Sequence, residues 1–431
     1  MGQIIISLIV ISALFAVPVA AVLGLAALGL DQLYMFGRLR AGLAEIIWSK
    51  SSEFLFVAVP MFILLGEIIL RSGVSQRMYA AVTKWISWLP GGLMHANIAS
   101  SAIFAATSGS SVATAATVGT VAYPEIEKNN YNESLFLGSV AAGGTLGILI
   151  PPSIALVIYG LLTDTSVPEL YLAGILPGML LAILFSILIM IICRYKKTWG
   201  GARIHSTWKE KLEALPDLLP PVFLFIGVIG SIYSGFATPT EAAAIGVMIS
   251  IVIAAYFKSL TVSMLKDAFE ATMRTTAMIM IIIFAAMFLN FVLGILGITR
   301  EIVDFINSVG LSPVVTIYII VFVYIIMGMF METVAMLLTT VPIVFPIVLG
   351  LDVPEYNGVW FGILVTLLME TALITPPIGI NLYVVQSIRK RGGSFNDVAI
   401  GALPFVLAIL MMIIILIHLP QVALWLPQAF Y

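Results

Sequence analysis

Residues 141–153 read AAGGTLGILIPPS, and they interrupt an apolar stretch that runs from residue 135 to residue 160. Two consecutive prolines remove two backbone donors, and the nearby glycines add flexibility, so we expect a helix here to unwind in its middle. Residues 370–379 read ETALITPPIG and interrupt the apolar residues 357–385 in the same way. We call these two stretches the first and the second break. Each predicts a broken helix that lines a cavity or lies within protein, because non-helical backbone does not survive in lipid.

The composition predicts a polytopic all-α membrane protein. The chain has 431 residues, of which 61% are hydrophobic and 10% charged, and its mean hydropathy is +1.13. A soluble protein would carry about a quarter charged residues. The apolar runs are continuous rather than alternating, which favours helices over barrel strands. The predicted spans lie near residues 4–30, 54–71, 135–160, 168–193, 217–235, 239–257, 270–296, 357–385 and 398–420. The first is expected to be a retained span, since no basic signal-peptide segment precedes it.

The basic residues set the expected orientation. With a cytoplasmic N-terminus, sixteen Lys and Arg residues fall on the cytoplasmic side and four fall outside. The four are Arg38, Arg40, Lys50 and Arg300. Since positive residues favour the cytoplasmic side, we expect the N-terminus inside and the C-terminus in the periplasm. The amphipathic residues 75–88 are predicted to lie in the inner interface, and residues 299–308 in the outer one.

The order of motifs predicts two related halves. A Ser/Thr-Val-Ala triplet begins at Ser111 and at Thr333, and in each half an aromatic-Pro pair follows twelve residues later. The Pro-Pro pair of each break then follows in the same order. Under the expected orientation the halves are inverted, which is a common design of secondary transporters. The expected units are a first repeat at 1–198, a basic cytoplasmic linker with an extra helix at 199–235, and a second repeat at 236–431.

Each half also contains an apolar stretch that small and polar residues interrupt. Residues 94–124 and 313–348 are expected to be re-entrant hairpins, the inner and the outer one. The first tip (residues 107–111) reads TSGSS, and the second tip (residues 328–333) reads GMFMET. Hydroxyls and freed carbonyls are hard oxygen ligands, so each tip with the break of its own half predicts a cation site. The alternative is that these hydroxyls bond back to the helix backbone or permit close helix packing.

The substrate is expected between the two tips. Neither tip contains Lys or Arg, so an anionic solute would be held by hydroxyls, amide N–H groups, helix ends and bound cations. Two carboxylates, Glu332 and Glu370, are predicted at membrane depth, where they are either functional or neutral structural groups. Glu67 is expected to be an interface or subunit-contact residue. The candidate substrate residues are Ser110, Ser111, Thr145, Glu332 and Thr333.

The sequence contains few residues that could form an enzyme active site. His95, His205 and His418 are expected at a hairpin base, in a loop and at a span end, too far from a membrane-centre serine to act as its base. The single cysteine, Cys193, excludes an internal disulfide and a cysteine-based metal cluster. We therefore expect a carrier that has no resident cofactor, no transition metal and no nucleic-acid partner. A simple channel is disfavoured, because inverted broken hairpins suit alternating access better than a continuous pore.

Three motifs closely resemble the large membrane (M) subunit of tripartite ATP-independent periplasmic (TRAP) transporters, the DctM-like family. The motifs are residues 108–116, 141–153 and 375–379, and the resemblance extends over almost the whole chain. It implies an elevator-type carrier in the bacterial inner membrane, driven by sodium ions and the membrane potential. It also implies a small four-helix membrane (Q) subunit and a periplasmic solute-binding (P) protein that delivers a carboxylate.

The resemblance also implies sodium ligands. Members of this family that carry sialic acid hold one sodium ion between the inner hairpin tip and its broken helix, which points here to Ser108, Ser110, Gly147, Ile150 and Pro152. The internal repeat extends this to a second set, namely Glu332, Thr333, Ala372, Thr375 and Pro377. The second tip departs from the first because it has Met329, Phe330 and Met331 in place of hydroxyls. Ala372 departs as well, since the family often has glycine there.

The substrate class stays open at this stage. Sialic acid, four-carbon dicarboxylates and other organic acids all fit the resemblance, because specificity in such systems rests largely on the binding protein. The alternative function is a proton- or sodium-coupled organic anion carrier that works alone.

Overall fold

The computed structural model describes residues 18–202, 206–297, 310–389 and 392–430, together with Glu301, Asp304 and Ser308. Within these residues the chain is helical, and its β-structure is limited to an isolated bridge between Tyr131 and Gly200. The predicted all-α class is therefore confirmed. Several predicted features lie outside the described residues, namely 4–17 of the first span, most of 299–308, and Arg203, His205, Arg300, Lys390 and Arg391.

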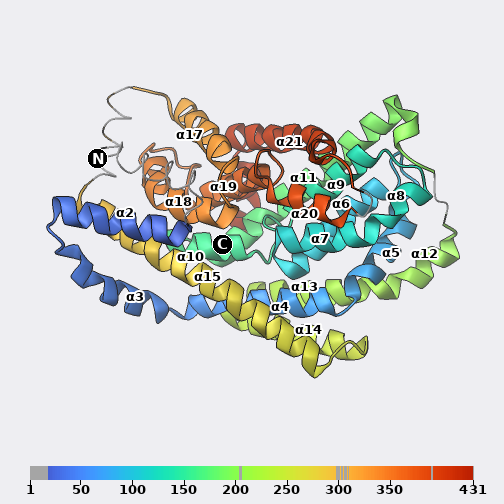
Figure 1. The fold of residues 1–431 in the computed structure, drawn as a ribbon, viewed down its shortest axis with the longest axis horizontal. Helices are drawn as coiled ribbons and strands as arrows, with labels where there is room; N and C mark the ends of the chain where they lie inside the picture. Colours follow the sequence, from blue (N-terminus) through green and yellow to red (C-terminus); the bar gives the residue numbers. More distant parts are fainter. Residues whose placement is uncertain are drawn as a thin grey trace.

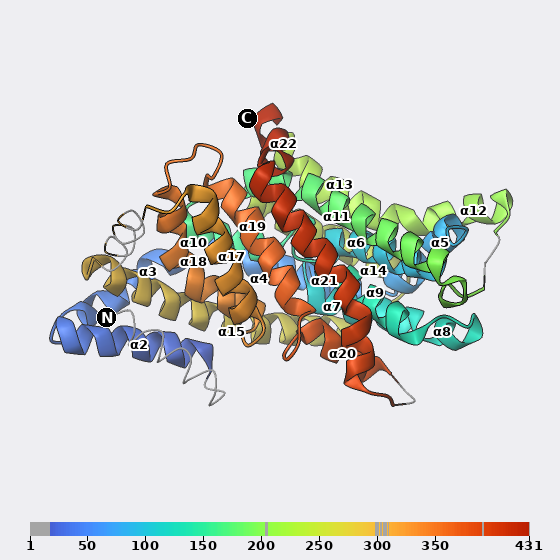
Figure 2. The same cartoon turned by 90° about the horizontal axis from the view of Figure 1, so that it is seen from above.

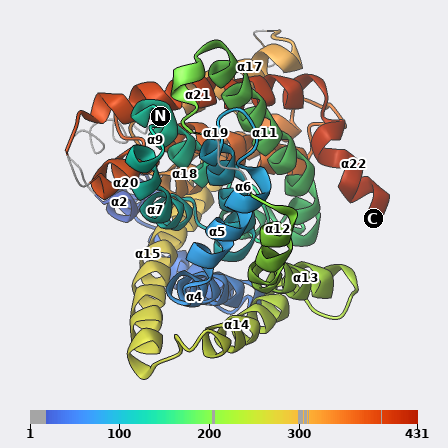
Figure 3. The ribbon, with the colours of Figure 1, turned by 90° about the vertical axis from the view of Figure 1, so that its right-hand side faces the viewer.

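One set of helices lies along the lower side of the view in Figure 1, and we call it the α4 group. Its members are α2 (Val19–Tyr34), α3 (Leu43–Ser51), α4 (Ala58–Arg71), α13 (Leu219–Tyr233), α14 (Pro239–Tyr256) and α15 (Val262–Ile295). Helix α4 packs against both α14 and α15, and Figure 3 shows it between them. Helix α15 packs along α2 as well.

A second set of helices contains both breaks, and we call it the break group. Its members are α6 (Leu93–Ser108), α7 (Ser111–Ala122), α9 (Glu133–Thr145), α10 (Ile154–Thr163), α17 (Pro313–Gly328), α18 (Thr333–Leu349), α19 (Gly358–Leu373) and α20 (Ile380–Ile388). Two long helices, α11 (Val167–Tyr195) and α21 (Phe395–His418), pack against it and against each other. Figure 2 shows α22 (Gln421–Phe430) at the C-terminal end, and this helix contacts α11, α19 and α21.

The remaining elements are short. They are α5 (Val74–Ile86), α8 (Pro124–Lys128), α12 (Trp208–Ala214) and the 3-10 turns at Leu39–Gly42, Phe54–Val57, Lys197–Trp199 and Leu215–Leu218. Helix α5 coincides with the amphipathic segment expected at 75–88. Helices α3 and α22 have no counterpart among the predicted spans, because each is too short to cross a bilayer.

The apolar helices agree well with the predicted spans. Among the described residues, six helices are long and apolar enough to cross a membrane by length and composition: Phe54–Arg71, Val167–Tyr195, Trp208–Tyr233, Pro239–Tyr256, Val262–Ile295 and Phe395–His418. The prediction placed the start of α15 at residue 270, eight residues too late, because the first turns of this helix are polar. Large apolar side chains stay exposed on α11, at Met179, Ile183, Ile187 and Ile191, as a lipid-facing stripe requires.

Side-chain caps determine where the helices of the break group begin. Ser110, Asn132, Ser153 and Asn357 each accept a hydrogen bond from the backbone N–H three residues further on. Such caps satisfy donors that have no partner inside the helix. The helices that follow the first tip and the first break therefore begin at hydroxyl residues of those same segments.

Both predicted broken helices are divided in two. In the first break, residues 146–153 separate α9 from α10, and in the second, residues 374–379 separate α19 from α20. Each segment contains a cis peptide bond, at Pro151-Pro152 and at Pro376-Pro377. The halves also cross over, since α10 packs against α18 while α20 packs against α7. Each half of the chain thus supplies a half-helix to the other half's helix pair.

Candidate functional site

The first tip lies directly on the first break. A Cβ atom added to Gly147 would lie 2.8 Å from the carbonyl carbon and oxygen of Ser110 and 2.9 Å from the nitrogen of Ser111. Ser111 Oγ also donates a hydrogen bond to the carbonyl oxygen of Thr145, at 3.2 Å. Only glycine at position 147 permits this approach, because real Cβ contacts are longer. The structure thus brings together the first-site residues Ser110 and Gly147.

Gly109 makes the turn between α6 and α7 and forms a second contact between the first tip and the first break. Its φ is +59°, and a Cβ atom there would lie 2.9 Å from the carbonyl oxygen of Pro152. On the other side of the tip, a Cβ atom on Gly66 of α4 would lie 2.7 Å from the carbonyl oxygen of Ser108. The tip is therefore enclosed between the break and a helix of the α4 group.

Two hydroxyls of the first tip, those of Ser108 and Ser110, have partners on helix α7. Ser110 Oγ accepts the N–H of Ala113 at 3.4 Å, and Thr114 Oγ1 donates to the Ser110 carbonyl at 2.7 Å. Ser108 Oγ lies 3.1 Å from Thr114 Oγ1. The alternative raised by the sequence, that the tip hydroxyls bond back to the helix backbone, applies to Thr107, whose Oγ1 donates to the Phe104 carbonyl at 2.8 Å.

The carbonyls of the first break are different. Among the described residues, no donor bonds to the backbone oxygens of Gly147, Ile150 and Pro152. A backbone acceptor in a protein interior normally has a partner. Free carbonyl oxygens are the ligands that hard cations prefer. These three residues of the predicted first sodium set are therefore able to act as ligands without breaking a protein hydrogen bond.

The second tip contacts the second break through Gly328 and Met329 rather than through the predicted tip residues Glu332 and Thr333. The N–H of Ile378 donates to the carbonyl oxygen of Met329 at 3.2 Å. A Cβ atom on Gly328 would lie 2.6 Å from Cβ of Ala372. In the described part of the chain, no hydrogen bond or ion pair joins Glu332 or Thr333 to the break. The tip and the break meet, but Glu332 does not carry the contact.

Glu332 caps helix α18 in this state. Its Oε2 accepts the N–H of Ala335 at 2.9 Å, and its Oε1 accepts the hydroxyl of Thr333 at 3.0 Å. A carboxylate at a helix N-terminus is favoured by the helix dipole. Thr375 Oγ1 similarly donates to the Thr371 carbonyl at 2.6 Å. The second sodium set is therefore less open than the first.

The five candidate substrate residues form two groups. Ser110, Ser111 and Thr145 meet at the first tip, whereas Glu332 and Thr333 meet at the second. No hydrogen bond among the described residues links the groups. A cavity of 430 Å³ opens elsewhere, between α3, α10, α15 and Pro342 of α18, and none of the predicted site residues lines it.

Glu370 is the most isolated carboxyl group of the break group. Its side chain is 0% exposed, and neither carboxylate oxygen has a hydrogen-bond partner in the described structure. It lies on α19, two residues before Ala372. The carboxylate of Glu67 pairs with Arg71 one turn along α4.

Sequence reasoning missed two polar residues near the breaks, Asn381 and Arg389. Asn381 Nδ2 donates to the carbonyl oxygen of Ala141 at 3.1 Å, and Asn381 is 0% exposed. Arg389 binds Glu133 and Asp397, and hydrogen bonding to Glu133 raises the pKa of its guanidinium. Asn381 is the one strongly polar residue early in an apolar half-helix, which is the signal that could have marked it.

The site combines two tips, two breaks and membrane-length helices, as in an integral membrane carrier. Residues 5–422 match the family described as "Tripartite ATP-independent periplasmic transporter, DctM component". The chain belongs to this family, which confirms the predicted resemblance. Its members are transport proteins rather than enzymes, and the family functions with a periplasmic binding protein and a small membrane subunit.

Individual relatives support the assignment. The chain is 35% identical to a C4-dicarboxylate TRAP transporter large permease protein of Pseudomonas aeruginosa, over 90% of this chain and 89% of that protein. It is 29% identical to a sialic acid TRAP transporter large permease protein of Vibrio cholerae, over 88% and 87%. The fold resembles that of the YdaH transporter of Alcanivorax borkumensis, with a TM-score of 0.66 at 14% identity, covering 88% of this chain and 87% of that one.

Proposed function

We propose that this protein performs sodium-coupled secondary active uptake of a small organic acid. The substrate class is sialic acid, a dicarboxylate or a similar carboxylate. The observation that carries the proposal is the first tip lying on the first break, beside the free carbonyl oxygens of Gly147, Ile150 and Pro152. A carbonyl oxygen coordinates a metal cation but is a poor base for a proton. The donor set therefore favours sodium over protons as the coupling ion.

The proposed first sodium site consists of Ser108, Ser110, Gly147, Ile150 and Pro152. All five ligand groups are neutral, which suits a monovalent ion better than a divalent one. The proposed second site consists of Glu332, Thr333, Ala372, Thr375 and Pro377. Glu332 already accepts the Ala335 N–H and the Thr333 hydroxyl and, among the residues that the structure describes, makes no bond to the second break, so we expect the second site to be completed by a local rearrangement.

An anionic substrate would gain its attraction from neutral groups and from the bound ions. Helix α7 begins at Ser111, so its N-terminal dipole is directed toward the first tip. Ser110, Ser111 and Thr145 supply hydroxyls near that helix end, and Glu332 and Thr333 are proposed to face the substrate from the second tip. Sodium bound at both breaks would offset the absence of Lys and Arg from the tips.

The proposed movement is of the elevator type. The break group would move as a block against the α4 group, with the tips acting as re-entrant hairpins and the repeats at 1–198 and 236–431 inverted. The N-terminus would lie in the cytoplasm and the C-terminus in the periplasm. Transport would require the small Q subunit and the periplasmic P protein, with sodium as coupling ion and no resident cofactor.

Uptake into proteoliposomes tests this function. The large subunit would be reconstituted with its small subunit and binding protein, and radiolabelled sialic acid and four-carbon dicarboxylates would be supplied outside. We expect uptake of one of them only with an inward sodium gradient and with the binding protein present. Uptake that continues without the binding protein, or after choline replaces sodium, would overturn the proposal.

A further inference from the structure

Asn381 joins the second half of the chain to the first break. It is the second residue of α20, and its Nδ2 donates to the carbonyl oxygen of Ala141 at 3.1 Å. The two residues are 240 positions apart, and Asn381 is completely buried. Ala141 is the first residue of the first break, whereas Asn381 follows the last residue of the second break by two positions. One hydrogen bond therefore connects α20, the half-helix that follows the second break, to the first break.

The surroundings of Asn381 are tight. A Cβ atom on Gly144 would lie 3.1 Å from Asn381 Nδ2 and 2.6 Å from Cβ of Ala115 on α7. Helices α7, α9 and α20 therefore meet at Gly144, one residue before Thr145 and three before Gly147. The amide cannot move without disturbing the residues that receive the first tip.

The Ala141 bond is the only one that the Asn381 side chain makes with the described residues. Its Oδ1 has no hydrogen-bond partner there. A leucine at this position has a similar size and would lose the Nδ2 bond while breaking no other protein contact of the amide. This makes Asn381 well suited to a substitution experiment.

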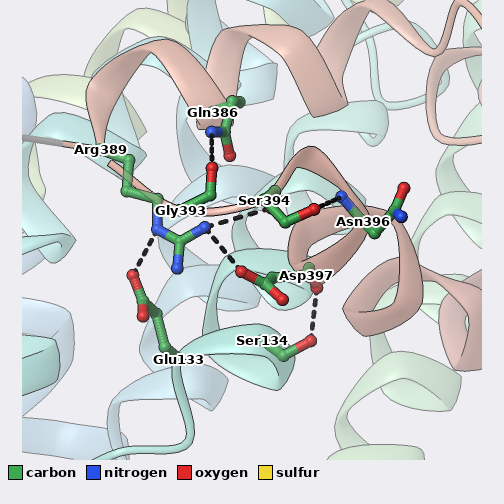
Figure 4. Close-up of polar contacts among 8 residues, drawn as sticks. All are labelled: Glu133, Ser134, Gln386, Arg389, Gly393, Ser394, Asn396 and Asp397. Atoms are coloured by element: carbon green, nitrogen blue, oxygen red, sulfur yellow. Dashed lines mark hydrogen bonds and ion pairs between the residues drawn. The ribbon is translucent and has the colours of Figure 1, made fainter. Parts of the chain in front are cut away.

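A second connection holds the other end of the same helix pair (Figure 4). Arg389 Nε donates to Glu133 Oε1 at 2.6 Å, and Arg389 Nη1 donates to Asp397 Oδ2 at 3.0 Å. Glu133 lies eight residues before Ala141, and Arg389 lies eight residues after Asn381. The equal spacing means that α9 and α20 run antiparallel and are bonded at both ends. A displacement of α20 is therefore passed on to α9.

We propose that Asn381 is a positioning residue that couples ion binding at the two breaks. An ion that orders the second break fixes the start of α20, and Asn381 then holds Ala141 and Gly144 in the geometry that receives the first tip. By linkage, an ion at the first break favours binding at the second equally. This inference rests on the proposed function, because it requires two sodium sites.

Sodium binding to the purified large subunit in complex with its small subunit tests the coupling without any substrate. Bound sodium would be measured by equilibrium dialysis with radioactive sodium chloride, which replaces choline chloride at constant ionic strength. We expect a sigmoidal dependence with a Hill coefficient of about 2 for the wild type. With Asn381→Leu the coefficient should fall to about 1, and the half-saturating sodium concentration should rise about tenfold.

Tyr356→Phe is the matched control. Tyr356 Oη donates to the Ile417 carbonyl at 3.2 Å, so this variant also loses a buried bond to a distant backbone oxygen, but far from either break. We expect it to keep the wild-type Hill coefficient. Asn381→Ser, which is too short to reach Ala141, replaces the leucine variant if that protein does not elute as a folded complex.

The outcomes separate the two proposals. A complex that binds no sodium overturns the proposed function and the inference together. Sodium binding with an unchanged Hill coefficient in the Asn381 variants, or an equal loss of cooperativity in Tyr356→Phe, overturns the inference alone. A Hill coefficient of about 1 in a wild-type protein that binds sodium also overturns the inference alone.

Discussion

Gly138 of α9 and Gly401 of α21 are in direct backbone contact. A Cβ atom on Gly138 would lie 2.0 Å from the carbonyl oxygen of Gly401, and one on Gly401 would lie 1.8 Å from the carbonyl oxygen of Ser134. Small residues allow such approach between membrane helices, where packing rather than the hydrophobic effect drives association. The Ser134 hydroxyl adds a bond to the Asp397 carbonyl at the end of the same contact.

Gly138→Ala and Gly401→Ala should therefore each reduce stability. Neither backbone can shift without separating α9 from α21. We therefore expect each variant to lose about 1–3 kcal/mol of the free energy of unfolding, as overpacked cores do. The yield of monodisperse protein and the melting temperature would report it. Gly24→Ala on α2 is the control, because nothing lies within 4 Å of its added Cβ atom. Equal behaviour of all three variants would show that the α9–α21 contact tolerates a methyl group.

Gly147→Leu should abolish uptake while the protein still inserts and folds. The larger side chain would collide with Ser110 and Ser111 and separate the first tip from the first break. Ser108→Pro should do the same from the side of the tip. Gly29→Leu on α2, where the added Cβ atom meets nothing within 4 Å, is the control and should transport normally. Normal uptake by both site variants would move the first cation site elsewhere.

Arg389→Gln should destabilise the C-terminal end of α20. The Arg389 side chain is 6% exposed, and its loss leaves Glu133 and Asp397 without their shared cation. We expect a loss of about 1–2 kcal/mol, since both carboxylates stay partly exposed and solvent screens them. Arg71→Gln, which removes an ion pair within one helix, should lower the melting temperature much less. If Arg71→Gln lowered the melting temperature as much as Arg389→Gln does, the cluster of Arg389, Glu133 and Asp397 would have no special stabilising role.

The same cluster should stabilise the protein evenly across the pH range of transport assays. The hydrogen bond to Glu133 raises the pKa of Arg389 in the folded state. A raised pKa contributes stability that is fully present below the pKa of arginine in the unfolded state and is lost only as the pH rises through the folded-state pKa. The difference in melting temperature between wild type and Arg389→Gln should therefore be the same at about pH 7 and about pH 9. A difference that disappears by the higher pH would contradict this assignment.

Glu370→Gln should be tolerated. A carboxylate that is fully buried and has no partner is too costly to hold as an ion, so we expect the neutral acid, which glutamine imitates in shape and charge. Sodium-driven uptake should stay within about twofold of the wild-type rate, since no charge is lost. The uptake rate of Glu370→Leu, which removes the polar group altogether, is measured for comparison. Loss of uptake in the glutamine variant would instead make the ionised side chain part of the ion pathway.

The Pro-Pro breaks and the long spans could be predicted because they depend on local chemistry. Proline lacks an N–H wherever it stands, and a run such as 398–420 is apolar irrespective of its neighbours. The cap formed by Glu332 could not be read in this way, since glutamate is not among the usual N-cap residues. The bond between Asn381 and Ala141 joins positions 240 apart, and nothing in either local sequence signals the other. Such pairs are determined by how the helices pack in the folded protein.

Gly66 of α4 lies against the carbonyl oxygen of Ser108, where the α4 group touches the first tip. In the proposed elevator movement this tip must slide past α4 on every transport cycle. A side chain at position 66 would collide with the moving tip and raise the energy barrier to each passage, whereas glycine leaves the surface of α4 free of such a protrusion. The turnover rate of this carrier should then depend on a residue that binds neither ion nor substrate.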